Sequence, residues 1–217
     1  MSADTAYHGE LGEQFAALAT DNVHNAHTDR PAMLRLAGDV TGTRVLDIGC
    51  GAGHYGAELL KRGAARFTGI DGSETLLDAA RQRLGDDAIL HCHDLEQPLT
   101  FLADHSFDLA VMALVYHHVA ARGQLLAEIR RVLRPGGRLL VSTTHPTGDW
   151  IHFGGSIRSD TRSPGIARTS WPSRSVAPDR RRDPRNADAP RTGDRDTIFL
   201  RSGKIWAKTL RRPDHEV

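Results

Sequence analysis

The stretch Val45-Leu46-Asp47-Ile48-Gly49-Cys50-Gly51-Ala52-Gly53 joins a short apolar run to a loop rich in glycine. A second apolar run, which ends in Ile70-Asp71-Gly72-Ser73, follows after a segment with the length of a helix. Together they predict a buried strand, a glycine loop, a helix and a second strand that ends in a carboxylate. Glycine lets the backbone approach a ligand closely, and an acid at the end of the second strand can bind ribose hydroxyls. This part of the chain therefore predicts a nucleoside site.

The residues around this stretch alternate between further strands and helices. Phe107–Leu114 is a continuous apolar run, typical of a parallel strand that is covered on both faces. Parallel strands joined by single helices predict an α/β fold, with a Rossmann-like, doubly wound, mostly parallel sheet and helices on both faces. The expected strands cover residues 44–48, 67–70, 88–92, 107–114 and 138–143.

Residues 1–40 are expected to form a helical cap before the first strand. Leu11, Phe15 and Leu18 recur at helical spacing. Asp29 is expected to be the N-cap of a second helix, because Pro31 suits the first turn that would follow it.

The chain of 217 residues is long enough for one α/β domain with a full core. It contains no apolar run near the roughly 20 residues that span a bilayer. Its first residues do not resemble a signal peptide, so a cytoplasmic protein without a membrane partner is expected. Cys50 and Cys92 are too few for a disulfide framework, and both are expected to be small buried residues. No cluster of His and Cys has metal-ligand spacing, so no metal is expected.

The charge of the chain changes sharply after residue 155. The formal charge is +1 overall, −6 over residues 1–155 and +7 over residues 156–217. Residues 156–195 are rich in Arg, Asp, Pro and Ser and lack periodicity, which predicts irregular or disordered chain. An apolar run at 197–200 suggests one further strand, with 204–210 as its partner. We therefore predict a cofactor-binding domain over residues 1–155 and a divergent C-terminal segment over residues 156–217.

Two classes of cofactor compete for the glycine loop. Gly51-Ala52-Gly53-His54-Tyr55-Gly56 satisfies the GxGxxG pattern of dinucleotide sites, in which a pyrophosphate lies on a helix N-terminus. Asp47, at the end of the first strand, would repel a pyrophosphate and attract a cationic group. S-adenosylmethionine carries an ammonium and a sulfonium and no phosphate, so the acid favours this cofactor. An NAD-dependent oxidoreductase is the weaker alternative.

Five blocks of the sequence resemble, in order, the class I S-adenosylmethionine-dependent methyltransferases, in particular the branch that acts on small molecules. They are VLDIGCGAG, GIDGS, HCHDL, SFDLAVMALVYHHV and LRPGGRLLVSTTHP, within residues 30–155. The resemblance implies methyl transfer to a small-molecule acceptor by direct displacement, with S-adenosylhomocysteine as product. A nucleic acid is not the expected acceptor, because Ala113-Leu114-Val115-Tyr116 replaces the Asn-Pro-Pro-Tyr-like block of enzymes that methylate amino groups of nucleic acids. The oligomeric state is not predicted.

The resemblance assigns the cofactor contacts to loops at the carboxyl ends of the strands. Asp47 would bind the amino group of the methionine part, and Asp71 would bind the ribose hydroxyls. Asp94 would face the adenine amino group. Each of these acids also has a structural interpretation, as a cap or a turn residue. The other cofactor contacts would come from Gly49, Cys50, Gly51, Gly72, Ser73, Leu95 and Ala113.

Methyl transfer needs a base only when the acceptor must lose a proton as it attacks. His117 and His118 follow the fourth strand at the edge of the sheet where such folds bind ligands, and His145 follows the fifth strand. These three are the candidate catalytic residues. The chain has 12 histidines, so a structural role is the simpler explanation for each one.

After residue 155 the sequence departs from the family, whose members usually continue with an ordered insertion and two closing strands. We expect the closing strands to be incomplete, which would leave the fifth strand as an exposed edge. A frameshift or an internal deletion would explain the composition, and a basic arm that attracts phosphates is the other interpretation. Because the part of the chain after residue 155 should choose the acceptor, a protein that binds the cofactor without catalysis is the main alternative to an enzyme.

Overall fold

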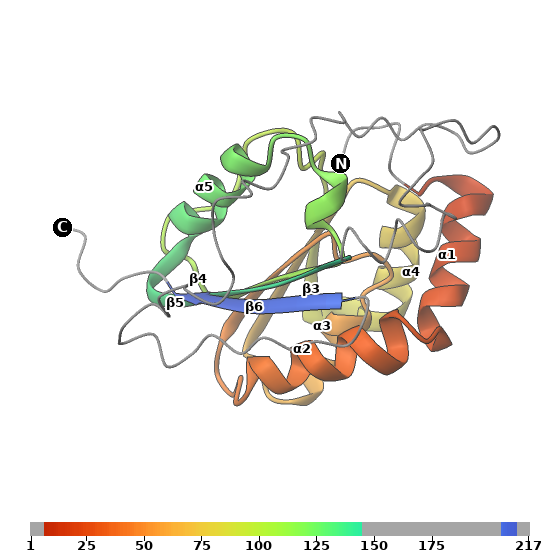
Figure 1. Cartoon of the computed structure of the whole chain (residues 1–217), viewed down its shortest axis with the longest axis horizontal. Helices are drawn as coiled ribbons and strands as arrows, with labels where there is room; N and C mark the ends of the chain where they lie inside the picture. Colours follow the sequence, from red (N-terminus) through yellow and green to blue (C-terminus); the bar gives the residue numbers. More distant parts are fainter. Residues whose placement is uncertain (1–6, 145–204, 212–217) are drawn as a thin grey trace, which may run out of the picture.

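The computed structural model describes residues 7–144 and 205–211, which form one sheet with helices on both faces (Figure 1). The strand order is β3-β2-β1-β4-β5-β6. The first five strands pair in parallel, and β6 pairs with β5 in the antiparallel sense. The order reverses between β1 and β4, the place where doubly wound sheets bind ligands, so the expected fold is confirmed. The strands are β1 (Arg44–Ile48), β2 (Arg66–Asp71), β3 (Ala88–Cys92), β4 (Phe107–Ala113), β5 (Leu133–Thr144) and β6 (Ile205–Arg211).

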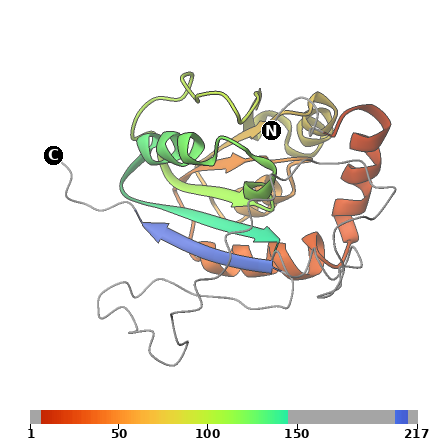
Figure 2. The ribbon, with the colours of Figure 1, turned by 45° about the horizontal axis from the view of Figure 1, so that its top comes forward.

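The helices are divided between the two faces of the sheet. They are α1 (Gly9–Asp21), α2 (Arg30–Ala37), α3 (His54–Lys61), α4 (Glu74–Leu84) and α5 (Arg122–Val132). Helices α2, α3 and α4 pack with Val45 of β1 in one core cluster, whereas α5 packs with Leu46 in the other. Figure 2 shows α2 and α5 on opposite sides of the strands. Since Val45 and Leu46 are successive residues, the strand's own alternation separates the two clusters. Within the described part of the chain, no helix is long and apolar enough to cross a bilayer.

Helix α1 forms where the apolar spacing predicts it, but its large apolar side chains are not the ones it buries. Gly12 and Ala19 are its buried residues, whereas Leu11 and Leu18 are 58% and 64% exposed. A Cβ on Gly12 would lie 3.0 Å from the side chain of Thr75, so α1 packs closely on α4 through a small residue. The spacing thus predicts the helix but not the face that is covered.

Strand β6 corrects two expectations about the C-terminal segment. Its residues do form a strand, but it pairs with β5, with Ile205 opposite Thr144 and Arg211 opposite Arg138. The edge of β5 is therefore not exposed along this length, because β6 takes up its backbone hydrogen bonds. The expected partner, 197–200, lies outside the described residues, as does most of the segment whose composition predicts irregular chain. Beside β5, β6 lies where the resemblance implies an antiparallel closing strand.

Candidate functional site

The loop between β1 and α3 depends on its glycines. Gly49 and Gly51 have φ angles of +71° and +53°, in the left-handed region that favours glycine. The amides of Gly49 and Cys50 both donate to the carbonyl of Ile70, at 2.7 and 2.9 Å, which holds the loop against β2. A Cβ on Gly49 would lie 2.3 Å from Cγ2 of Val115, whereas one on Gly51 would meet nothing within 4 Å. The loop is therefore tightly packed at Gly49 and open beside Gly51, where a ligand can reach the backbone.

Asp71 joins the two turns at the carboxyl ends of β1 and β2. Its Oδ2 accepts a hydrogen bond from the Gly51 amide at 2.8 Å, and its Oδ1 accepts one from the Ser73 amide at 2.9 Å. Burial raises the pKa of Asp71, and these backbone hydrogen bonds oppose the rise. Each carboxylate oxygen has two acceptor positions, so both bonds are compatible with further hydrogen bonds from ribose hydroxyls. Ribose binding by Asp71 stays a prediction.

Asp47, the acid at the end of β1, is buried without a partner. The residue is 1% exposed, and neither carboxylate oxygen has a hydrogen-bond partner within the described residues. Burial, with the neighbouring charge of Asp71, raises the pKa of Asp47 to about 8. A buried acid of this kind is costly, and a bound cationic group would relieve the cost. Asp47 therefore fits an ammonium and opposes a pyrophosphate.

Asp29 does not cap α2, contrary to the prediction from the sequence. Residues Asn25–Asp29 form a π-helical turn, η1, that continues directly into α2. The backbone of Asp29 is already helical, with φ −70° and ψ −56°, and its side chain makes no capping bond. An N-cap needs an extended backbone, which is why the prediction is wrong. Instead Asp29 is 2% exposed, and its Oδ2 accepts a hydrogen bond from the Tyr55 hydroxyl at 2.6 Å.

Ser73 caps α4 and also holds the N-terminal segment. Its Oγ accepts a hydrogen bond from the Leu76 amide at 3.2 Å, and its hydroxyl donates to the carbonyl of Tyr7. Gly72 lies half-buried between Asp71 and Ser73. The second turn thus connects the carboxyl edge of the sheet to the segment before α1.

The two cysteines have different environments. Cys50, in the glycine loop, is buried, and burial raises the pKa of its thiol, so it is a packing residue and not a nucleophile. Cys92 is exposed, so the expectation of burial is wrong for this residue. It is the last residue of β3, which lies at one end of the strand order and is only partly covered.

The remaining cofactor candidates follow β3 and β4. Oδ1 of Asp94 accepts a hydrogen bond at 3.0 Å from the amide two residues later, so this acid does start a turn. Leu95 is buried in the core cluster of α5. Ala113 is the last residue of β4, and Leu114 after it has an unusual φ of +58°. The Leu114 amide donates to the carbonyl and the hydroxyl of Ser142, at 3.0 and 3.1 Å, which fixes the end of β4 against β5.

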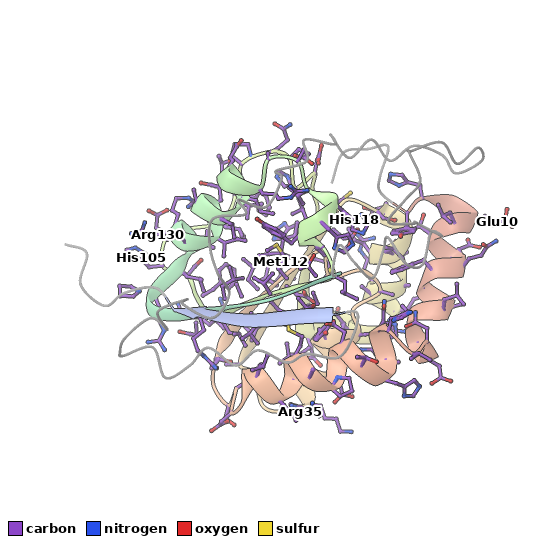
Figure 3. The ribbon with its side chains drawn as sticks, viewed as in Figure 1. Glu10, Arg35, His105, Met112, His118 and Arg130 are labelled. Atoms are coloured by element: carbon purple, nitrogen blue, oxygen red, sulfur yellow. The ribbon has the colours of Figure 1, made fainter. Side chains whose placement is uncertain are left out.

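Two of the three candidate catalytic histidines lie in η3 (Tyr116–His118), a short 3-10 helix after β4. Nδ1 of His117 is 3.1 Å from Oγ1 of Thr143 on β5. The ring centroids of His117 and His118 are 4.0 Å apart, and Figure 3 shows His118 beside the carboxyl ends of the strands. The third candidate, His145, lies outside the described residues.

Comparison with known proteins identifies the domain that carries this site. A crystal structure of an S-adenosylmethionine-dependent methyltransferase from Mesorhizobium loti is 34% identical, with a TM-score of 0.51 over 54% of this chain and 53% of that one. Residues 46–141 match the family of methyltransferase domains. Residues 46–141 therefore form a methyltransferase domain, similar to that of S-adenosylmethionine-dependent methyltransferases.

Curated relatives are similar to this chain over part of their length. Methyltransferase GfsG of Streptomyces halstedii is 33% identical in an alignment of 156 positions that covers 63% of this chain and 55% of the relative. Demethylmenaquinone methyltransferase of Clavibacter sepedonicus is 36% identical over 121 residues, which are 55% of this chain and 49% of the relative. The chain thus spans about half the length of these relatives.

The residues of the site fit the cofactor of the family. The open backbone at Gly51, the unpaired Asp47 and the ordered Asp71 meet at the carboxyl end of β1, as the sequence predicts. Sequence reasoning missed Asp29 and Tyr55. An Asp close before a Pro is an ordinary capping pattern, and Tyr55 fills an unspecified position of GxGxxG, so neither residue stands out in the sequence.

Proposed function

We propose that this protein transfers the methyl group of S-adenosylmethionine to a small-molecule acceptor. The observation that carries the proposal is the carboxylate of Asp47, buried without a partner at the ligand-binding edge of the sheet. An ammonium would pair with it, whereas the pyrophosphate of a nicotinamide dinucleotide would be repelled. The methyltransferase domain supports the same choice. An oxidoreductase is supported only by the GxGxxG match.

A small acceptor is supported by the name of a relative, a demethylmenaquinone methyltransferase. Nucleic acid is not proposed as the acceptor, because the sequence after β4 lacks the block that the resemblance associates with it. The cytoplasm is the proposed location.

The cofactor supplies a methyl group on a sulfonium that is already activated for attack. The task of the chain is therefore to bind, to align the acceptor and to exclude water. In this proposal Asp47 holds the amino group, Asp71 the ribose and Asp94 the adenine edge. Backbone contacts come from the loops that carry Gly49, Cys50, Gly51, Gly72, Ser73, Leu95 and Ala113.

His117 is the proposed base for an acceptor that must lose a proton. Its Nδ1 lies 3.1 Å from the Thr143 hydroxyl, which orients the ring, so Nε2 would be the nitrogen that takes the proton. His118, whose ring lies against that of His117, and His145 are the alternatives.

Binding and turnover are tested separately. Titration calorimetry with S-adenosylhomocysteine and with NAD measures which nucleoside the site takes. Transfer of a labelled methyl group to a panel of phenols, hydroquinones and carboxylates measures activity. Binding of S-adenosylhomocysteine with turnover supports the proposal, and binding without turnover favours a cofactor-binding protein. Binding of NAD alone would overturn the proposal.

The role of His117 has its own test. His117→Ala is expected to lower kcat about 100- to 10,000-fold and to leave the affinity for S-adenosylhomocysteine unchanged. The matched control is His105→Ala, because His105 is exposed and precedes β4, at the opposite end of that strand from η3. An equal loss in both variants, or none in His117→Ala, would remove the assignment.

A further inference from the structure

Within the described residues, the buried side-chain atoms that lack a hydrogen-bond partner gather at one place. They are Oδ1 of Asp29, Nε of Arg30, both carboxylate oxygens of Asp47 and Nε2 of His54. These residues lie at the end of β1 and at the starts of α2 and α3. Native proteins pair nearly all buried polar groups, so such a concentration points to a ligand that supplies the missing partners.

Asp29 lies among these atoms as a second buried acid. Its Oδ2 accepts the hydrogen bond of the Tyr55 hydroxyl at 2.6 Å, while its Oδ1 has no partner. The charges of Asp29 and Asp47 both help to raise the pKa of Tyr55, which places both acids near this tyrosine. The hydroxyl of Ser142 on β5 accepts a hydrogen bond from the Leu114 amide at 3.1 Å. The same hydroxyl is close enough to Asp29 to oppose the rise that burial causes in the pKa of this acid. Asp29 is therefore near the carboxyl ends of β4 and β5, at the ligand-binding edge of the sheet.

The signs of the unpaired groups limit what the ligand can be. Asp29 and Asp47 supply two acceptors for a positively charged donor. Nε of Arg30 supplies a donor for a negative group, and burial lowers the pKa of His54 to about 4, so this histidine is neutral. Carboxylates beside a guanidinium match a zwitterion, such as the ammonium and carboxylate groups of an α-amino acid.

We propose that Asp29 is a second binding residue for the α-ammonium of the cofactor's amino-acid head, in addition to Asp47, and that Tyr55 is the positioning residue that holds the Asp29 carboxylate. This inference rests on the proposed function, because it assigns a subsite within the same cofactor site. Two acceptors can direct the hydrogen bonds of one ammonium, which has three donors, better than one acceptor can. The site then recognises the amino-acid head and not only the nucleoside.

The subsite is tested with two ligands that differ in this head. S-adenosylhomocysteine carries the amino acid, and 5′-methylthioadenosine carries the same nucleoside and sulfur without it. Titration calorimetry of both ligands is carried out on the wild type, Asp29→Asn, Tyr55→Phe and Asp86→Asn. Asp86 is an exposed acid of the turn after α4 and is the matched control.

Asp29→Asn is expected to weaken the binding of S-adenosylhomocysteine about 10- to 150-fold and to leave that of 5′-methylthioadenosine unchanged. Tyr55→Phe should give a smaller loss with the same selectivity, and Asp86→Asn should change neither affinity. The unchanged binding of 5′-methylthioadenosine shows that each variant is folded around the nucleoside.

Equal losses for the two ligands, or no loss for either, would overturn the subsite. If Asp29→Asn does not fold, Tyr55→Phe tests the subsite instead. An unchanged ratio of its affinities for the two ligands would then overturn the subsite. A wild type that binds neither ligand would instead contradict the proposed function. The two failures are therefore distinguishable.

Discussion

Replacement of Asp47 by asparagine is expected to stabilise the ligand-free protein, and to do so more at high pH than at low pH. Burial and the charge of Asp71 raise the pKa of Asp47 from 3.8 to about 8. Between these values the folded protein keeps a proton that the unfolded chain releases, so the free energy of unfolding falls as the pH rises. Below this window the group is protonated in both states, and above it the group is ionised in both.

The magnitude follows from the two pKa values. A difference of one pH unit within the window changes the free energy of unfolding by about 1.4 kcal/mol, so the wild type loses about 4 kcal/mol by pH 7. Asparagine does not titrate and buries a polar group of similar size, so it recovers most of that loss. We expect the free energy of unfolding of Asp47→Asn to exceed that of the wild type by about 2–4 kcal/mol at pH 7 and by about 1–2 kcal/mol at pH 5.

Urea unfolding of both proteins at pH 5, 6, 7 and 8 measures the difference. Asp86→Asn is the control, because it makes the same substitution at an exposed acid of the turn after α4. A difference between Asp47→Asn and the wild type that stays constant from pH 5 to pH 8 would refute the reasoning. So would a variant less stable than the wild type at pH 8.

Further predictions concern the ligand and the glycine loop. Binding of S-adenosylhomocysteine at pH 7 is expected to release close to one proton in the wild type and none in Asp47→Asn, because an ammonium lowers the pKa of this acid. Calorimetry in buffers of different ionisation enthalpy measures the release, and equal release would contradict the pairing. Asp71→Ala is expected to weaken this binding about 10- to 150-fold in the same titration, and an unchanged affinity would remove the ribose assignment. Gly49→Ala is expected to lower the free energy of unfolding, measured in urea, by about 2–5 kcal/mol, because the alanine Cβ would overlap Val115 at a left-handed backbone position. Gly42→Ala, at a φ of +72° with open space around it, should cost only about 1–2 kcal/mol, and equal losses would refute the overlap.

The strands and the glycine loop were predictable because local patterns encode them. The alternation of Val45 and Leu46 between two covered faces makes β1 a continuous apolar run, and residues of β4 (Phe107–Ala113) are divided between the same two clusters. The charge of Asp47 before the glycines also favoured S-adenosylmethionine over a dinucleotide, and the family resemblance supported the same choice. These features depend on neighbours in the sequence, which is why the sequence reveals them.

Features that depend on distant contacts were not predictable in the same way. Whether Asp29 caps a helix or lies buried depends on a π-helical turn and on Tyr55, 26 residues away. The partner of β6 is β5, more than 60 residues earlier in the chain, and no local pattern indicates that pairing. The exposure of Leu11 and Leu18 depends on which face of α1 meets α4, which spacing leaves open.

The pairing of β5 with β6 has a consequence for how this domain can diversify. Thr144, the last residue of β5, and Ile205, the first residue of β6, are opposite each other. When the two ends of a segment are already neighbours, a doubling of its length adds only about 0.6 kcal/mol of closure entropy. The segment between them can therefore be lengthened, shortened or replaced in evolution, or exchanged by an engineer, while the strands that carry the cofactor site keep their register.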